Sequence, residues 1–111
     1  MNKIKERVAI VTGAAKNIGR STCIELAKLN YNILIHANTD LKGAEETSQE
    51  VKKLGVKCEI KIGDLTDEPF ANSLIKESLQ LGELAVVVNN ASQRNFIKFE
   101  DMSYQDWQKV I

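Results

Sequence analysis

The sequence predicts an α/β fold built on a doubly wound parallel sheet, with the strand order 3-2-1-4. Short apolar runs alternate with amphipathic helical patterns, as they do in consecutive β-α-β units. The first apolar run, residues 8–11, leads through Thr12 and Gly13 straight into a helical pattern, and the apolar run 84–88 ends in two asparagines. Right-handed crossovers then give this strand order and place both polar strand ends at one edge of the sheet.

The first half of the chain predicts two helices that each pack one face against the sheet. A helix over residues 17–29 follows the glycine turn, and the apolar centre of residues 32–37 predicts the second strand. A second helix over residues 41–54 stops at Gly55, a residue type that often ends helices. The expected inner face of the first helix contains Ile18, Thr22, Cys23, Leu26 and Ala27. That of the second contains Ala44, Thr47, Val51 and Leu54.

The second half continues the alternation. Residues 56–62 alternate apolar and charged side chains, which predicts a strand at or near a sheet edge. The acidic, proline-bearing run 66–69 predicts the first turn of a third helix that ends at Gly82. Its expected inner face contains Phe70, Ala71, Leu74, Ile75, Ser78 and Leu79. After strand 84–88 and a loop, Ser103 and Asp106 suggest a capping box that opens a last helix, whose apolar face begins with Trp107, Val110 and Ile111.

Length and composition bound the kind of protein. The chain has 111 residues, which suits one domain, and its 15 basic and 15 acidic residues give a formal net charge of zero. Hence no basic field argues for nucleic acid, and no apolar stretch is long enough for a membrane span. The polar N-terminus does not resemble a signal peptide. Cys23 and Cys58 are interpreted as buried apolar groups rather than a disulfide or metal pair, so we expect a cytoplasmic protein.

The glycine turn suggests anion binding. Gly13 permits a sharp turn and leaves no side chain in the way of a ligand, and the helix from Asn17 points free N–H groups at the same place. An ordinary β-to-α turn is the alternative. The full dinucleotide fingerprint has a third glycine, but Lys16 and Asn17 fill both intermediate positions. Because Asn is the least costly non-glycine residue in the left-handed region, Asn17 can stand where glycine is expected.

The turn and the later strand together resemble the classical short-chain dehydrogenase/reductase family. Its two sequence marks are Thr-Gly-x-x-x-Gly-x-Gly and Asn-Asn-Ala-Gly. Here Asn17 replaces the middle glycine, and Ser92 ends the second mark. The resemblance covers essentially the whole chain, implies a Rossmann-like fold, and is strongest to 3-oxoacyl-carrier-protein reductases and pteridine reductases. Typical pteridine reductases, however, carry a basic residue where this chain has Asn17.

The resemblance also implies a set of cofactor-binding residues. The turn would wrap the adenosine and pyrophosphate, an acidic residue after the third strand would bind the adenine amino group, and the second mark would lie along the riboses. Asp64 could instead serve only as a helix N-terminal charge. Thr12 would help to join the turn to the asparagine strand, and Asn89 would tie the sheet together. The implied set is Thr12, Gly13, Ala14, Ala15, Lys16, Asn17, Ile18, Gly19, Asn38, Asp64, Leu65, Asn90, Ala91 and Ser92.

The residues at two positions favour NADP(H) over NAD(H), which is still possible. In the family a basic residue at Lys16 often binds the 2′-phosphate, although the side chain could equally be a solvated surface lysine. The family's selective position falls at Ala37 or Asn38, and neither is acidic. Asp40 is the contrary signal, since an acid about 20 residues after the turn can bind the ribose of NAD. We interpret Asp40 as lying past the strand.

Other chemistry-bearing residues are weaker candidates. His36 is the only histidine, and its place within a strand favours a core or sheet residue over a catalytic base. Arg94 and Phe96 lie on the loop where a substrate pocket would begin.

The family's proton-transfer groups are not expected in this chain. They are a serine, a Tyr-x-x-x-Lys pair and a supporting asparagine. Tyr31 and Tyr104 are followed four residues later by Ile35 and Gln108, so neither begins the Tyr-x-x-x-Lys pair. Residues 1–111 are therefore expected to be an NAD(P)-binding half-domain that stops before the catalytic residues, with no catalytic residue and no metal ligand of its own.

The parent would transfer hydride between the nicotinamide and a carbonyl or alcohol substrate. A homo-oligomer is expected, with neither nucleic acid nor a membrane as partner. The alternative is a non-catalytic dinucleotide-binding module that functions as it stands.

Overall fold

Residues 5–90 are described by a computed structural model, and they form seven alternating strands and helices. Each strand carries an apolar run, and each helix follows a turn that contains a glycine, asparagine, aspartate or proline near its start. The elements are β1 (Arg7–Thr12), α1 (Asn17–Lys28), β2 (Asn32–Ala37), α2 (Leu41–Lys52), β3 (Cys58–Ile62), α3 (Glu68–Leu81) and β4 (Glu83–Asn89).

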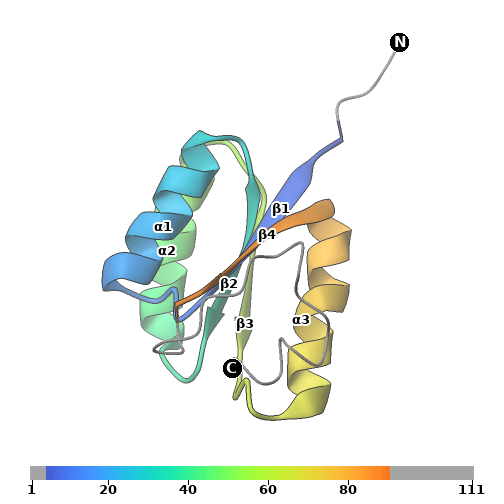
Figure 1. Cartoon of the computed structure of the whole chain (residues 1–111). Coiled ribbons are helices and arrows are strands. Elements are labelled where there is room, and N and C mark those ends of the chain that lie inside the picture. Colours follow the sequence, from blue (N-terminus) through green and yellow to red (C-terminus); the bar gives the residue numbers. More distant parts are fainter. Residues whose placement is uncertain (1–4, 91–111) are drawn as a thin grey trace.

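The sheet is parallel and has the order β3-β2-β1-β4, so the predicted strand order is confirmed. Figure 1 shows three layers, with α1 and α2 on one face of the sheet and α3 on the other. Because all strands run the same way, their carboxyl ends meet at one edge, next to the beginnings of the helices. The predicted edge position of the third strand is also confirmed, since β3 pairs only with β2 among the described residues.

Two apolar clusters fill the spaces between the layers. Successive side chains of β1 and β2 point to opposite faces, which sends Ala9 and Val11 to one cluster and Val8 and Ile10 to the other. The first cluster includes buried residues of α1 and α2, and the second includes buried residues of α3. Both faces of the two central strands are therefore covered, as expected for a parallel sheet.

Three expected core residues are exposed instead. Ile18 is 72% exposed and Leu79 is 60% exposed, although both lie within helices at inner-face spacing. Ile18 is the second residue of α1, whose buried residues are Gly19, Cys23 and Ala27. On α3 the buried residues are Ala71, Leu74, Ser78 and Leu81. At 3.6 residues per turn, Leu79 is rotated away from the face that these four residues share. Leu54 is 40% exposed because α2 ends at Lys52, before the predicted Leu54.

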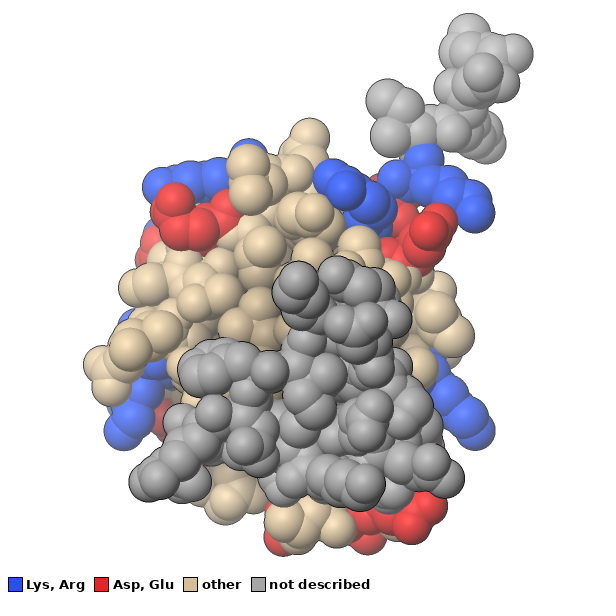
Figure 2. Space-filling view, in the orientation of Figure 1, with Lys and Arg blue, Asp and Glu red and all other residues tan. Residues whose placement is uncertain are grey.

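None of the helices among residues 5–90 is long and apolar enough to cross a membrane. Figure 2 shows acidic and basic side chains of both signs distributed around the rim of the face in view. The expected last helix, opened by Ser103, and the loop residues Arg94 and Phe96 lie outside the described residues.

Candidate functional site

The turn between β1 and α1 has the backbone that its glycine and asparagine predict. Gly13 has a φ of 61° and Asn17 has a φ of 56°, so both lie in the left-handed region. Glycine enters this region without steric cost, and asparagine does so more readily than other L residues. Asn17 therefore has the left-handed backbone that is expected of a residue standing in for glycine.

The beginning of α1 packs against the turn through Gly19. A Cβ atom at this position would collide with the carbonyl oxygen of Gly13 and would lie 2.8 Å from Cα of Ala14. It would also lie 2.9 Å from Nδ2 of Asn90, at the end of β4. The absence of a side chain at Gly19 thus brings the first turn of α1 directly against two strand ends.

The ends of β1 and β4 are joined by side-chain hydrogen bonds. The hydroxyl of Thr12 donates to Oδ1 of Asn89 at 2.9 Å, and Nδ2 of Asn90 donates to the carbonyl of Gly13 at 3.0 Å. Thr12 is fully buried and links the two strands just before the turn. The glycine turn and the asparagine-ended strand, which are far apart in the sequence, are therefore hydrogen-bonded to each other.

The N-terminus of α1 keeps donors available for a ligand. Lys16 is the N-cap residue, its side chain makes no capping hydrogen bond, and no acidic residue lies in the first turn of the helix. Helical N–H groups at this end have no partner within the helix, and the helix dipole gives them positive character. Lys16 is exposed and adds a cation at the same end.

Arg20 holds the turn against α2. Its Nη2 donates to the carbonyl of Ala15 at 2.6 Å, and its Nε donates to Oγ1 of Thr47 at 3.0 Å. The Thr47 hydroxyl donates in turn to the carbonyl of Ala14 at 2.8 Å. The sequence does not predict this role of Arg20, since nothing in the helical pattern shows that its guanidinium reaches back to the preceding loop.

The three residues at and after the end of β2 that could face a ribose lie in different environments. Ala37 is buried at the strand end, and Asn38 is exposed just after it. Asp40 is the N-cap of α2, where its Oδ1 accepts from the backbone N–H of Gly43 at 2.9 Å. The prediction that Asp40 lies past the strand is confirmed, and its carboxylate has a structural role in capping the helix.

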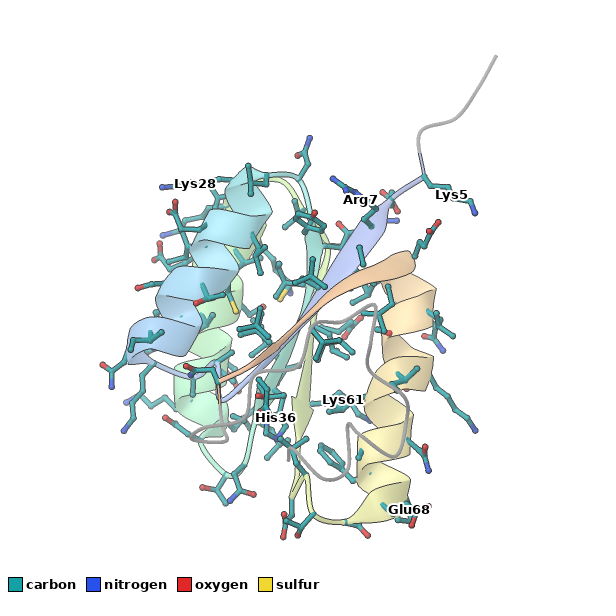
Figure 3. The ribbon with its side chains drawn as sticks, in the orientation of Figure 1. Lys5, Arg7, Lys28, His36, Lys61 and Glu68 are labelled. Atoms are coloured by element: carbon teal, nitrogen blue, oxygen red, sulfur yellow. The ribbon has the colours of Figure 1, made fainter. Side chains whose placement is uncertain are left out.

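His36 is a buried residue of β2, as expected, but its contacts were not foreseen. Its Nδ1 accepts from the backbone N–H of Gly13 at 3.2 Å, and its Nε2 lies 2.9 Å from the carbonyl oxygen of Gly63. Its own carbonyl accepts from the N–H of Ala14 at 2.8 Å. Figure 3 shows His36 near the carboxyl edge of the sheet. Burial lowers the pKa of this imidazole below its ordinary value.

Asp64 follows β3 at the same edge. Its Oδ1 accepts from the backbone N–H of Thr66 at 2.8 Å and from the Thr66 hydroxyl at 2.7 Å. These two donors lower the pKa of the Asp64 carboxyl, so the group is ionised at neutral pH. Asp64 is exposed, whereas its neighbour Leu65 is buried in the core next to α3.

The carboxyl edge of the sheet therefore gathers groups suited to a long, anionic, hydrogen-bonding ligand. The turn, the α1 N-terminus and Asn90 are in direct contact, while Asn38 and Asp64 follow the neighbouring strands β2 and β3. Among residues 5–90 no group of His, Cys, Asp and Glu could hold a metal ion. Two further expected site residues, Ala91 and Ser92, lie outside the described part of the chain.

Comparisons with known proteins found a family model and several relatives that match this chain. A family model described as short chain dehydrogenase matches residues 7–111. General stress protein 39 of Bacillus subtilis (strain 168) is 36% identical over 95 residues, which are 85% of this chain and 33% of that protein.

Two solved structures are also similar. The crystal structure of acetoin dehydrogenase from Enterobacter cloacae matches with a TM-score of 0.73 and 32% identity, covering 96% of this chain and 42% of that one. That of acetoin dehydrogenase YohF from Salmonella typhimurium matches with a TM-score of 0.69 and 30% identity, covering 94% of this chain and 44% of that one. The chain thus spans less than half the length of these relatives.

Proposed function

From the premise that this chain belongs to the short-chain dehydrogenase family of oxidoreductases, we propose that it binds NADP(H) at the carboxyl edge of its sheet. The observation that carries the proposal is the close packing at Gly19. Because Gly19 has no Cβ, the first turn of α1 packs directly against Gly13 and Asn90, and the helix N-terminus lies next to the glycine turn. A pyrophosphate at that position would accept hydrogen bonds from backbone N–H groups and gain from the helix dipole.

The rest of the dinucleotide can be assigned to residues along the same edge. Asp64 is an exposed, ionised acceptor for the adenine amino group, with the backbone of Leu65 beside it. Asn90, followed by Ala91 and Ser92, would lie along the riboses. These roles follow from the family resemblance, and the exposure of Asn38 and Asp64 supports them.

The preference for the phosphorylated cofactor rests on charge. A carboxylate at the end of β2 would accept from the ribose 2′-hydroxyl and repel a 2′-phosphate. Neither Ala37 nor Asn38 is acidic, and the carboxylate of Asp40 caps α2 instead. Lys16, exposed at the N-terminus of α1, supplies a positive charge for the 2′-phosphate.

When bound, the nicotinamide would supply or accept hydride in a reaction of a carbonyl or alcohol substrate. The residues of this chain would hold and orient the dinucleotide. This part of the proposal takes its substrate class from the family, since the chain spans less than half of its relatives. A homo-oligomer is part of the same proposal.

Nucleotide titration of the purified chain tests the proposal. We expect the fluorescence of NADPH to change on binding and NADP⁺ to compete, with weaker competition by NAD⁺. We also expect no oxidation of NADPH with a panel of ketones, because no Tyr-x-x-x-Lys pair is present in the sequence. Failure of all three nucleotides to bind would contradict the proposal. Turnover that survives repurification and disappears in Gly13→Val would show that catalytic groups are present after all.

A further inference from the structure

His36 connects the two loops that the proposed dinucleotide site uses. One ring nitrogen, Nδ1, lies 3.2 Å from the backbone nitrogen of Gly13 in the glycine turn. The other, Nε2, lies 2.9 Å from the carbonyl oxygen of Gly63, the residue before Asp64. His36 is 1% exposed. Because water does not reach the ring, losing either hydrogen bond would leave a buried polar group without a partner, which is energetically costly.

The two partners together determine the protonation state of the ring. The Gly13 N–H can only donate, so Nδ1 must carry a lone pair. The Gly63 carbonyl can only accept, so Nε2 must carry the hydrogen. Only the neutral imidazole with its hydrogen on Nε2 satisfies both contacts, and the imidazolium form would direct an N–H group at the N–H of Gly13.

Protonation would therefore act on the turn itself. Gly13 has a φ of 61°, in the left-handed region, and its N–H group points at the imidazole ring. If Nδ1 gained a proton, this N–H would lose its acceptor and face a second donor in a buried place. The neighbouring bond from Ala14 N–H to the His36 carbonyl at 2.8 Å would remain, so the change would concentrate at Gly13.

The charged groups around the ring come from three elements. Lys61 is the register partner of His36 on β3, and the Asp64 carboxylate after β3 raises the imidazole pKa. From α3 the ring meets Phe70, with ring centroids 5.8 Å apart, while Glu68 is exposed at the helix beginning. Figure 3 shows Arg7, the charged residue of β1, at the opposite end of the strand. Desolvation by burial lowers the pKa of the imidazole and outweighs both the hydrogen bond to the Gly63 carbonyl and the Asp64 carboxylate, which raise it.

We propose that His36 is a positioning residue that holds the glycine turn in its binding conformation through a neutral imidazole, so that acidification weakens dinucleotide binding. This inference rests on the proposed function, because it concerns the same turn. Under this proposal, nucleotide affinity depends on the protonation of His36, although the imidazole does not contact the nucleotide.

Isotope-edited NMR of the full chain tests the ring and the turn together. We expect the imidazole nitrogen shifts at neutral pH to show the Nε2-protonated form, and the Gly13 amide signal to move with the same midpoint as His36. A ring with its hydrogen on Nδ1, or a Gly13 amide that is indifferent to the titration, would overturn the inference without any ligand.

Nucleotide affinity as a function of pH gives the second readout. NADH is the main probe, because the 2′-phosphate of NADPH titrates near pH 6 on its own, as phosphate monoesters do. Below the pKa of His36 we expect the wild-type affinity to fall up to about tenfold for each pH unit. In His36→Asn, whose amide oxygen can accept from Gly13 without titrating, we expect a flat profile.

The variants separate the possible outcomes. His36→Leu removes the acceptor, so we expect about fivefold weaker binding or more at every pH, again with a flat profile. An equal slope in wild type and His36→Asn would overturn the inference while leaving the proposed function intact. Absence of binding in all variants at all pH values would contradict the proposed function itself. Circular dichroism at each pH confirms that the fold persists.

Discussion

Asn90 donates a side-chain hydrogen bond to the carbonyl of Gly13 at 3.0 Å, across a separation of 77 residues. The bond joins the end of β4 to the turn after β1, and Gly19 makes room for it because a Cβ there would lie 2.9 Å from the same Nδ2 atom. The paired asparagines therefore help to shape the turn, in addition to any contact with a ligand.

Gly19→Ala tests the close packing that carries the proposed function. The added methyl group would collide with the Gly13 carbonyl oxygen, which is backbone and cannot rotate away. We expect a loss of about 1–3 kcal/mol in the free energy of unfolding and a larger loss of NADPH affinity. Urea denaturation and nucleotide titration measure the two effects. Ser21→Ala, on the exposed side of the same helix, is the matched control.

Asn17 tests the left-handed position in the turn. Asn17→Gly relieves the conformational cost at a φ of 56°, and we expect its stability to equal or exceed that of the wild type. Asn17→Val should lose about 1–3 kcal/mol, because a β-branched residue enters this region only under strain. Thermal and urea unfolding of the two variants decide the point. Equal stability of Val and Gly at this position would mean that the turn adopts another backbone in solution.

Lys16→Ala tests the choice between the two cofactors. Removing the cation should weaken NADPH binding by about 1–3 kcal/mol, as for a charge-assisted hydrogen bond, and should leave NADH binding unchanged. Lys28→Ala, at the opposite end of α1, is the control for a general loss of positive charge. Isothermal titration with both nucleotides measures the difference. Equal or tighter binding of NADH by the wild type would point to Asp40 as the ribose partner.

His36 also predicts how stability depends on pH. Burial of the ring lowers its pKa in the folded chain below the ordinary value of 6.5, so the unfolded chain binds more protons as the pH falls below that value. The contribution of the neutral ring is therefore fully present above pH 6.5 and is lost as the pH falls through the folded pKa. His36→Asn should show a smaller decrease in the free energy of unfolding between neutral and mildly acidic pH. Urea titrations at several pH values measure this, and parallel curves for the two proteins would contradict it.

The edge of β4 predicts self-association. Among residues 5–90, β4 pairs with β1 alone, and its residues 84–88 are apolar and only half-buried. Unprotected apolar edges pair readily with other strands. We expect the molecular mass from light scattering to rise with concentration, and Val87→Lys, which adds a charge on this strand, to shift the chain toward monomer. A monomer at high concentration with slow amide exchange over residues 85–88 would show that this edge is covered.

Much of the fold follows from local patterns in the sequence. The apolar runs and the helical spacing predict all seven described elements, and right-handed crossovers predict their order in the sheet. The backbone of Asn17 also follows locally, since it depends on the preferences of one residue in one turn. The exposure of Ile18 and Leu79 does not, because the rotation of a helix on a sheet depends on what the sheet presents to it.

The contacts that make the site were decided by the tertiary structure. The sequence by itself determined that a glycine turn and an asparagine-ended strand meet at one edge, because motif chemistry and strand order are both encoded locally. It did not determine that His36 would accept from Gly13, or that Arg20 would reach the carbonyl of Ala15. Those bonds depend on the distances between neighbouring strands and on the directions in which their ends point. Such distances and directions exist only once the sheet has assembled and its helices have packed.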